Sequence, residues 1–122
     1  MARILVIDDE VGVCSELAEL LEDDRHTVEC AENATAGIEK IKKTEYDLVF
    51  LDVLMPKIEG SEALLEIKTI TATPVVIISA YLAPEIEKQV LKSGALMCMK
   101  KPFKIREIKA VIDRVSKEKA AK

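Results

Sequence analysis

The stretch ILVIDDE, residues Ile4–Glu10, joins four consecutive apolar residues to three acidic ones. An uninterrupted aliphatic run of this length is typical of a strand buried on both faces, as in a parallel sheet. Leu48–Leu51 and Val75–Ile78 have the same character. Thr27–Cys30 alternates instead and Ala95–Met99 is weaker, which favours edge strands. The pattern therefore predicts a sheet with three central strands and two edge strands.

The segments between these runs have apolar residues at helical spacing. The stripes comprise Val13, Leu17, Leu20 and Leu21; Ala34, Ile38 and Ile41; Leu64, Leu65 and Ile67; Ile86, Val90 and Leu91; and Ile105, Ile108, Ile112 and Val115. Asn33 is a candidate N-cap, Pro84 suits a first helical turn, and Gly94 suits a helix end. Alternating strands and helices predict a doubly wound α/β domain with helices on both faces of a parallel sheet.

The length of 122 residues fits one domain. We expect residues 1–122 to form it, with 116–122 as the end of the last helix or the start of a linker. The net charge of −4 argues against direct nucleic-acid binding, which requires clustered Lys and Arg. No run approaches the ~20 apolar residues that span a bilayer, so we expect a cytoplasmic protein without a membrane segment.

Three cysteines are present, Cys14, Cys30 and Cys98. Their odd number, wide spacing and lack of a Cys-x-x-Cys pair argue against a disulfide framework or a zinc site. We therefore expect three separate buried thiols.

Polar residues follow several of the predicted strands. Asp8 and Asp9 follow the first, Asp52 the third, Ser79 the fourth, and Lys101 the fifth. Working sites of such folds lie outside the carboxyl ends of the strands, so these side chains should converge.

Clustered carboxylates repel one another unless a cation intervenes, and Mg²⁺ (or Mn²⁺) is suited to carboxylates, a carbonyl and water. Lys101 adds a positive charge and Ser79 a hydrogen-bond donor. A carboxylate nucleophile, a metal, an ammonium and a hydroxyl together can stabilise a phosphoryl group during its transfer.

Four motifs resemble the signature of the response-regulator receiver family of two-component signalling. They are IDDE (Ile7–Glu10), LDVLMPKIEG (Leu51–Gly60), SA (Ser79–Ala80) and KPF (Lys101–Phe103). The resemblance covers nearly the whole chain and implies a flavodoxin-like fold with strand order 2-1-3-4-5. This order comes from the family's doubly wound sheet and does not follow from the spacing of the residues. The resemblance also implies a cis peptide between Lys101 and Pro102.

The resemblance implies a role for each matching residue. Asp52 is the phosphoacceptor, Asp9 binds the metal directly, and Asp8 acts mostly through water. Leu54 offers its backbone carbonyl to the metal. Lys101 contacts a phosphoryl oxygen, and after phosphorylation Ser79 moves to bond another.

Partners also follow from the resemblance. The phosphodonor is a sensor histidine kinase, a histidine phosphotransfer protein, or a small molecule such as acetyl phosphate. The chain is not an enzyme in the usual sense, because it catalyses only its own phosphorylation and dephosphorylation. Phosphorylation should alter the face made by the fourth helix, the fifth strand and the fifth helix. An output domain or a second copy of the chain would bind there.

Two positions depart from the family pattern. Cys98 stands where many relatives carry Tyr or Phe, so the switch on that strand is altered, and Tyr81 is the nearby aromatic that would compensate. Leu54 cannot position an attacking water as an amide or acid would, which predicts a long-lived acyl phosphate.

Alternatives remain at this point. Asp8 and Asp9 could simply begin a helix, and Ser79 could cap a strand end. The chain could be an adaptor receiver that is never phosphorylated, which Cys98 favours. A phosphatase of the haloacid-dehalogenase type would need Asp-x-Asp, whereas this chain has Asp8-Asp9-Glu10.

Overall fold

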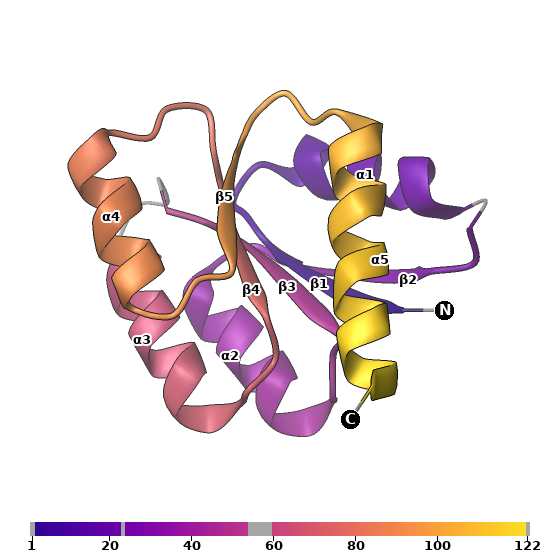
Figure 1. Cartoon of the computed structure of the whole chain (residues 1–122), viewed down its shortest axis with the longest axis horizontal. Coiled ribbons are helices and arrows are strands. Elements are labelled where there is room, and N and C mark those ends of the chain that lie inside the picture. The colour runs from indigo at the N-terminus through magenta and orange to yellow at the C-terminus, as the bar shows by residue number, and fades with distance from the viewer. Residues whose placement is uncertain (1, 23, 54–59, 122) are drawn as a thin grey trace.

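A computed structural model describes residues 2–22, 24–53 and 60–121. Within these residues five strands and five helices alternate along the chain (Figure 1). The elements are β1 (Arg3–Ile7), α1 (Val11–Glu22), β2 (Thr27–Ala31), α2 (Ala34–Lys43), β3 (Leu48–Asp52), α3 (Gly60–Ile70), β4 (Val75–Ser79), α4 (Pro84–Lys92), β5 (Met97–Lys100) and α5 (Ile105–Ala121). The predicted α/β alternation is confirmed, and α5 continues to Ala121 through most of the segment 116–122.

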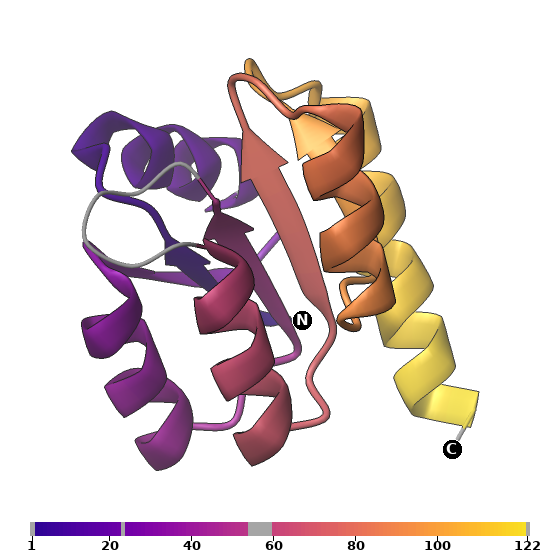
Figure 2. The ribbon, with the colours of Figure 1, turned by 90° about the vertical axis from the view of Figure 1, so that its left-hand side faces the viewer.

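The strands form one parallel sheet in the order β2-β1-β3-β4-β5, as the resemblance implied. The two strands with the weaker patterns, β2 and β5, are its edges. Helices α1 and α5 cover one face, and α2, α3 and α4 cover the other (Figures 1 and 2). This is the doubly wound arrangement predicted from the alternation of strands and helices.

The central strands separate two apolar cores, because successive side chains of a strand point to opposite faces. Val6 and Phe50 face the core beneath α1 and α5. Leu5, Ile7 and Leu51 face the core beneath α2, α3 and α4. Every residue of β3 and β4 is buried, which explains their uninterrupted apolar runs.

Local sequence signals set the helix ends. The Asn33 side chain accepts a hydrogen bond from Ala36 N at 2.8 Å and so caps α2. Pro84 occupies the first turn of α4. Gly94 follows α4 with a φ of 110°, a left-handed conformation that favours glycine. In the described residues, no helix has the length and apolar character needed to cross a membrane.

The cysteines correct one expectation. Cys14 of α1 and Cys30 of β2 form a disulfide, with their Cα atoms 6.0 Å apart, whereas Cys98 is a free thiol. That separation lies in the usual range for disulfides. The expectation of three separate thiols was wrong because the pairing depends on how α1 lies beside β2, which residue spacing does not reveal.

Candidate functional site

The acidic residues of the site lie at the carboxyl ends of two central strands. Asp52 is the last residue of β3 and Asp8 follows β1 directly. Both are buried, with 3% and 5% of their surfaces exposed. Because β1 and β3 are neighbours in register, their ends deliver the two carboxylates to the same place. The predicted convergence of Asp8 and Asp52 is therefore present.

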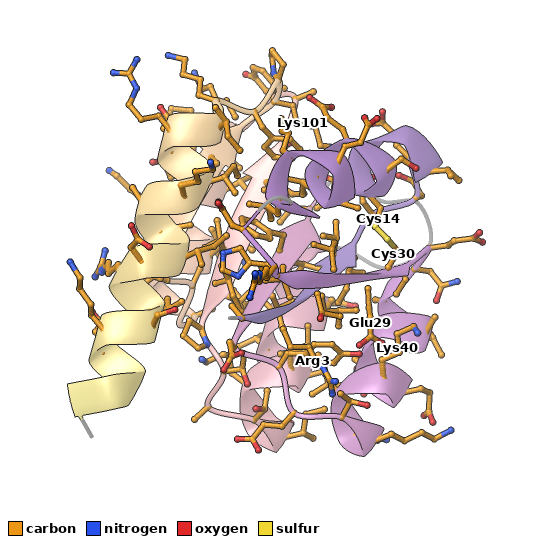
Figure 3. All side chains as sticks on the ribbon, turned by 90° about the vertical axis from the view of Figure 1, so that its right-hand side faces the viewer. Arg3, Cys14, Glu29, Cys30, Lys40 and Lys101 are labelled. Carbon is orange, nitrogen blue, oxygen red and sulfur yellow. A yellow bond between two sulfur atoms is a disulfide. The ribbon has the colours of Figure 1, made fainter. Side chains whose placement is uncertain are left out.

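Lys101 reaches this place from the end of the edge strand β5. Its Nζ atom lies 2.6 Å from Oδ2 of Asp8 and 3.0 Å from Oδ2 of Asp52. Glu10 Oε1 lies 3.4 Å from the same Nζ. Only 11% of the Lys101 side chain is exposed, so one largely buried ammonium links carboxylates from separate parts of the sequence. Figure 3 places Lys101 near α1, at the carboxyl end of the sheet.

Burial alone would lower the pKa of Lys101, because it disfavours the charged form. Hydrogen bonds to Asp8 and Asp52, and the attraction of their charges, outweigh burial and raise the pKa of Lys101 overall. The side chain is therefore a fixed cation at neutral pH. It supplies the positive charge that the clustered carboxylates require.

Three carboxylates could hold a metal ion here. Oxygens of Asp8, Glu10 and Asp52 all lie within 4.8 Å of one another, and no other such group occurs among the described residues. Hard oxygen donors of this kind suit a hard divalent cation. The donor set therefore fits the predicted kind of metal.

The membership of this group differs from the sequence-based assignment. Asp9 is exposed and is not part of it, whereas Glu10, which sequence reasoning left without a role, is. The available signal was that Glu10 continues the acidic run directly before α1. Which of three consecutive acidic side chains brings an oxygen close to Asp52 depends on the loop conformation. Leu54, the predicted carbonyl ligand, lies outside the described residues.

Ser79 is fully buried at the end of β4. Its Oγ donates a hydrogen bond to Tyr81 O at 2.6 Å and accepts one from Tyr81 N at 3.3 Å. The hydroxyl thus closes a short turn after the strand, as in the strand-cap alternative. A move toward the phosphoacceptor would require it to exchange these bonds for new ones.

Cys98 and Tyr81, the two other predicted switch residues, lie in different environments. Cys98 is half-buried and packs against the core beneath α4. Burial first, and then the charge of Glu87, raise the pKa of Cys98 to about 11, so it is a neutral thiol at neutral pH. Tyr81 is 70% exposed, so its ring does not fill the space that an aromatic at position 98 would occupy.

The segment after β5 holds Lys101 in place. Lys101 is the first residue after β5, and its backbone N donates a hydrogen bond to Ser79 O at 2.9 Å. The Lys101–Pro102 peptide bond is cis, as the resemblance implied. The two predicted residues Ser79 and Lys101 are therefore joined through the backbone, while their side chains have separate partners.

Comparison with known proteins agrees with this arrangement. The family model of the response regulator receiver domain matches residues 4–113. The chain belongs to this family. It is a receiver domain of the kind found in two-component response regulators, which leaves the haloacid-dehalogenase alternative without support.

Relatives of known name extend beyond the matched region. The chain is 35% identical over 122 residues to the transcriptional regulatory protein CpxR homolog of Haemophilus influenzae, covering 99% of this chain and 53% of that protein. It is 39% identical over 101 residues to the transcriptional regulatory protein ZraR of Klebsiella oxytoca. This match covers 82% of this chain and 23% of that protein. The receiver domain thus spans about half or less of these relatives.

Solved structures share the fold. A two-component response regulator from Clostridium difficile superposes with a TM-score of 0.91 at 25% identity, covering 96% of this chain and 97% of that one. NtrX from Brucella abortus gives a TM-score of 0.85 at 33% identity. This match covers 93% of this chain and 26% of that one.

Proposed function

We propose that this receiver domain takes a phosphoryl group on Asp52 and thereby switches between two states. The observation that carries the proposal is the contact of Lys101 Nζ with both Asp52 and Asp8. A carboxylate at a strand end, a fixed cation and further carboxylates around it are the parts that phosphoryl transfer to an aspartate needs.

Mg²⁺ is the proposed cofactor. The carboxylates that lie together are those of Asp8, Glu10 and Asp52. The family resemblance instead implies Asp8, Asp9, Asp52 and the Leu54 carbonyl as the metal-binding set. When bound, Mg²⁺ would neutralise charge on the phosphoryl oxygens. Asp52 forms the new P–O bond while the bond from phosphorus to the donor breaks. Lys101 holds its proton throughout and balances the developing negative charge, since its pKa is raised. The chain thus promotes its own modification and does not turn over a substrate.

Phosphorylation adds about −1.5 to −2 of charge beside Lys101. The ammonium must then be shared between Asp8 and the phosphoryl oxygens, and the Ser79 hydroxyl can exchange Tyr81 O for one of them. Because Lys101 N is bonded to Ser79 O, both changes act on the same two strand ends.

The face made by α4, β5 and α5 is the proposed readout surface. A hollow of about 370 Å³ between β5 and α5 is lined by Met97, Cys98, Met99, Glu107, Ala110, Val111 and Arg114. On α4, Ile86 and Leu91 are 39% and 42% exposed. These features support docking of an output domain or of a second copy of the chain.

The proposed donor is a sensor histidine kinase or a histidine phosphotransfer protein, and the proposed location is the cytoplasm. Both follow from membership of the receiver family. Because the relatives are named as transcriptional regulators, we further propose that the signal passes to a transcriptional output.

Intact mass after incubation with acetyl phosphate and Mg²⁺ tests the proposal. The wild-type chain should gain one phosphoryl group, whereas Asp52→Asn should gain none. Asp113→Asn, which replaces an exposed carboxylate on α5, is the control and should gain one. Chelation of Mg²⁺ before the donor is added should prevent the gain. If neither this donor nor a phosphorylated histidine kinase modifies the wild-type chain, the adaptor alternative replaces the proposal.

A further inference from the structure

The disulfide joins two cysteines with different access to solvent. Cys14 is 7% exposed and belongs to the core beneath α1 and α5. Cys30 is exposed on the edge strand β2. Figure 3 shows the bond between the helix and the strand, at the open edge of the sheet. A small reagent that attacks the bond therefore approaches from the side of Cys30, and Cys14 is the sulfur that leaves.

The same disulfide joins the two segments that flank the acidic loop Asp8–Glu10. On one side, Asp8 N donates a hydrogen bond to Ala31 O at 3.0 Å, and Ala31 directly follows Cys30. On the other side, Val13 N donates to Glu10 O at 3.1 Å, and Val13 directly precedes Cys14. The crosslink thus connects the two segments to which the ends of this loop are bonded.

We propose that Cys14 and Cys30 form a redox-reversible crosslink, exchanged with low-molecular-weight thiols at Cys30, that holds the acidic loop Asp8–Glu10 rigid when oxidised and loosens it when reduced. The crosslink itself and its effect on the loop are independent of phosphorylation. Only its consequence, a phosphoryl uptake at Asp52 that depends on redox state, rests on the function proposed above.

The exchange is balanced in two steps. A thiolate attacks Cys30 Sγ, the Cys14–Cys30 bond breaks, and Cys14 leaves as a thiolate that takes up a proton. A second thiolate attacks the mixed disulfide, releasing a small-molecule disulfide and the Cys30 thiol. Two electrons pass from two thiol molecules to the protein, and a small-molecule disulfide reverses both steps.

Cys98 does not compete in this exchange. It packs on the core beneath α2, α3 and α4, whereas Cys14 belongs to the core on the opposite face of the sheet. Its pKa of about 11 keeps it protonated at neutral pH. The thiolate is the nucleophile in thiol–disulfide exchange, so a protonated thiol reacts poorly. In a reducing compartment the disulfides that do form are usually transient and redox-sensing, which fits a bond with one accessible sulfur.

The first experiment counts thiols by alkylation and intact mass in the Cys98→Ser background. After treatment with oxidised glutathione, no cysteine should be alkylated. After treatment with excess reduced glutathione, two cysteines should be alkylated. Oxidation should raise the thermal midpoint by roughly 10 °C, because it closes a loop of the unfolded chain. Two free thiols after oxidation, or a bond that excess reduced thiol leaves intact, would overturn the proposal.

The second experiment measures hydrogen exchange of the Asp8, Asp9 and Glu10 amides in both redox states. Reduction should accelerate exchange there by a factor on the order of ten, because local opening becomes more populated. Cys30→Ser, at an exposed position, should exchange at the reduced rate in either buffer, and Cys98→Ser should respond as the wild type does. Equal exchange in the two states overturns the link to the loop.

Phosphoryl uptake from acetyl phosphate is then compared between the two redox states. Slower uptake by the reduced chain, and by Cys30→Ser in either buffer, is the expected result. Equal uptake in the two states overturns the regulatory consequence. No uptake in either state is a failure of the phosphoacceptor role, and the thiol count and the exchange rates are unaffected by that failure.

Discussion

Lys101 Nζ lies 2.6 Å from Asp8 Oδ2, and this pair joins the edge strand β5 to the central strand β1. The side chain of Asp8 is 1% exposed and that of Lys101 is 11% exposed, so solvent screens the pair weakly. The same ammonium contacts Asp52. The lysine therefore acts as an internal counterion for the carboxylates, at the position where a phosphoryl group and a metal ion would also interact.

Replacing Lys101 with Met should leave these buried carboxylates without their cation. Removal of one partner of a buried ion pair destabilises a protein by about 3 kcal/mol. We expect a loss of this size in urea denaturation with a chelator present, and a larger recovery on addition of Mg²⁺ than the wild type shows. Lys100→Met, at an exposed neighbouring position, is the control. An equal effect of Mg²⁺ on both variants would contradict the counterion role.

Ser79→Ala should separate acceptance of the phosphoryl group from its readout. The variant loses the bond from Oγ to Tyr81 O, so we expect a loss of about 1 kcal/mol in stability. It should still gain a phosphoryl group, but the amide resonance of Tyr81 should no longer shift on phosphorylation. Ser79→Thr retains the hydroxyl and should restore the shift. A full Tyr81 shift in the alanine variant would remove Ser79 from the switch.

Two glycines offer a matched test of packing. A Cβ atom at Gly37 of α2 would lie 2.6 Å from Cγ1 of Ile7, whereas one at Gly12 of α1 would meet nothing within 4 Å. Gly37→Ala should lose about 1 kcal/mol, because overpacking of about 1–3 kcal/mol exceeds the gain in helix propensity of about 1 kcal/mol. Gly12→Ala should be neutral or stabilised by up to about 1 kcal/mol.

Chemical denaturation of both glycine variants supplies the measurement, with Ile7→Val combined with Gly37→Ala as the second test. Valine lacks the Cδ1 atom of Ile7, which is the atom nearest the new methyl group, but keeps Cγ1, so the overpacking is relieved in part. The double variant should therefore be more stable than the sum of the two single effects. Strict additivity would mean that the contact with Cδ1 of Ile7 does not limit this position.

The order of strands and helices was predictable because its signals are local. Apolar runs such as Val75–Ile78 and caps such as Asn33 depend on neighbouring residues alone. The meeting of Asp8, Asp52 and Lys101 was also predictable, since the carboxyl ends of parallel strands share one edge of the sheet.

The features that were missed depend on geometry that pattern does not encode. Glu10 joins the carboxylate group through the conformation of the loop before α1. Cys30 meets Cys14 because α1 lies beside the edge strand β2. The Ser79 hydroxyl bonds within its own turn, which was one of two alternatives that the sequence left open.

The Cys98 thiol should make stability depend on alkaline pH. Its pKa is raised to about 11 in the folded chain, by burial first and by Glu87 second, against about 8.5 for a free cysteine. Between these values the folded state binds more protons than the unfolded state, so the free energy of unfolding falls as the pH rises. The contribution is complete below about pH 8.5 and is lost as the pH passes the folded value.

Urea denaturation of the wild type and Cys98→Ser from neutral to alkaline pH measures this contribution. Tyr46 and Lys101 also have raised pKa values, but they are common to both proteins and cancel in the difference. The wild type should lose stability more steeply than the serine variant above about pH 8.5. Glu87→Gln removes the second cause and should make the wild-type curve shallower. Parallel curves for the wild type and Cys98→Ser would show that the thiol titrates alike in the folded and unfolded chains.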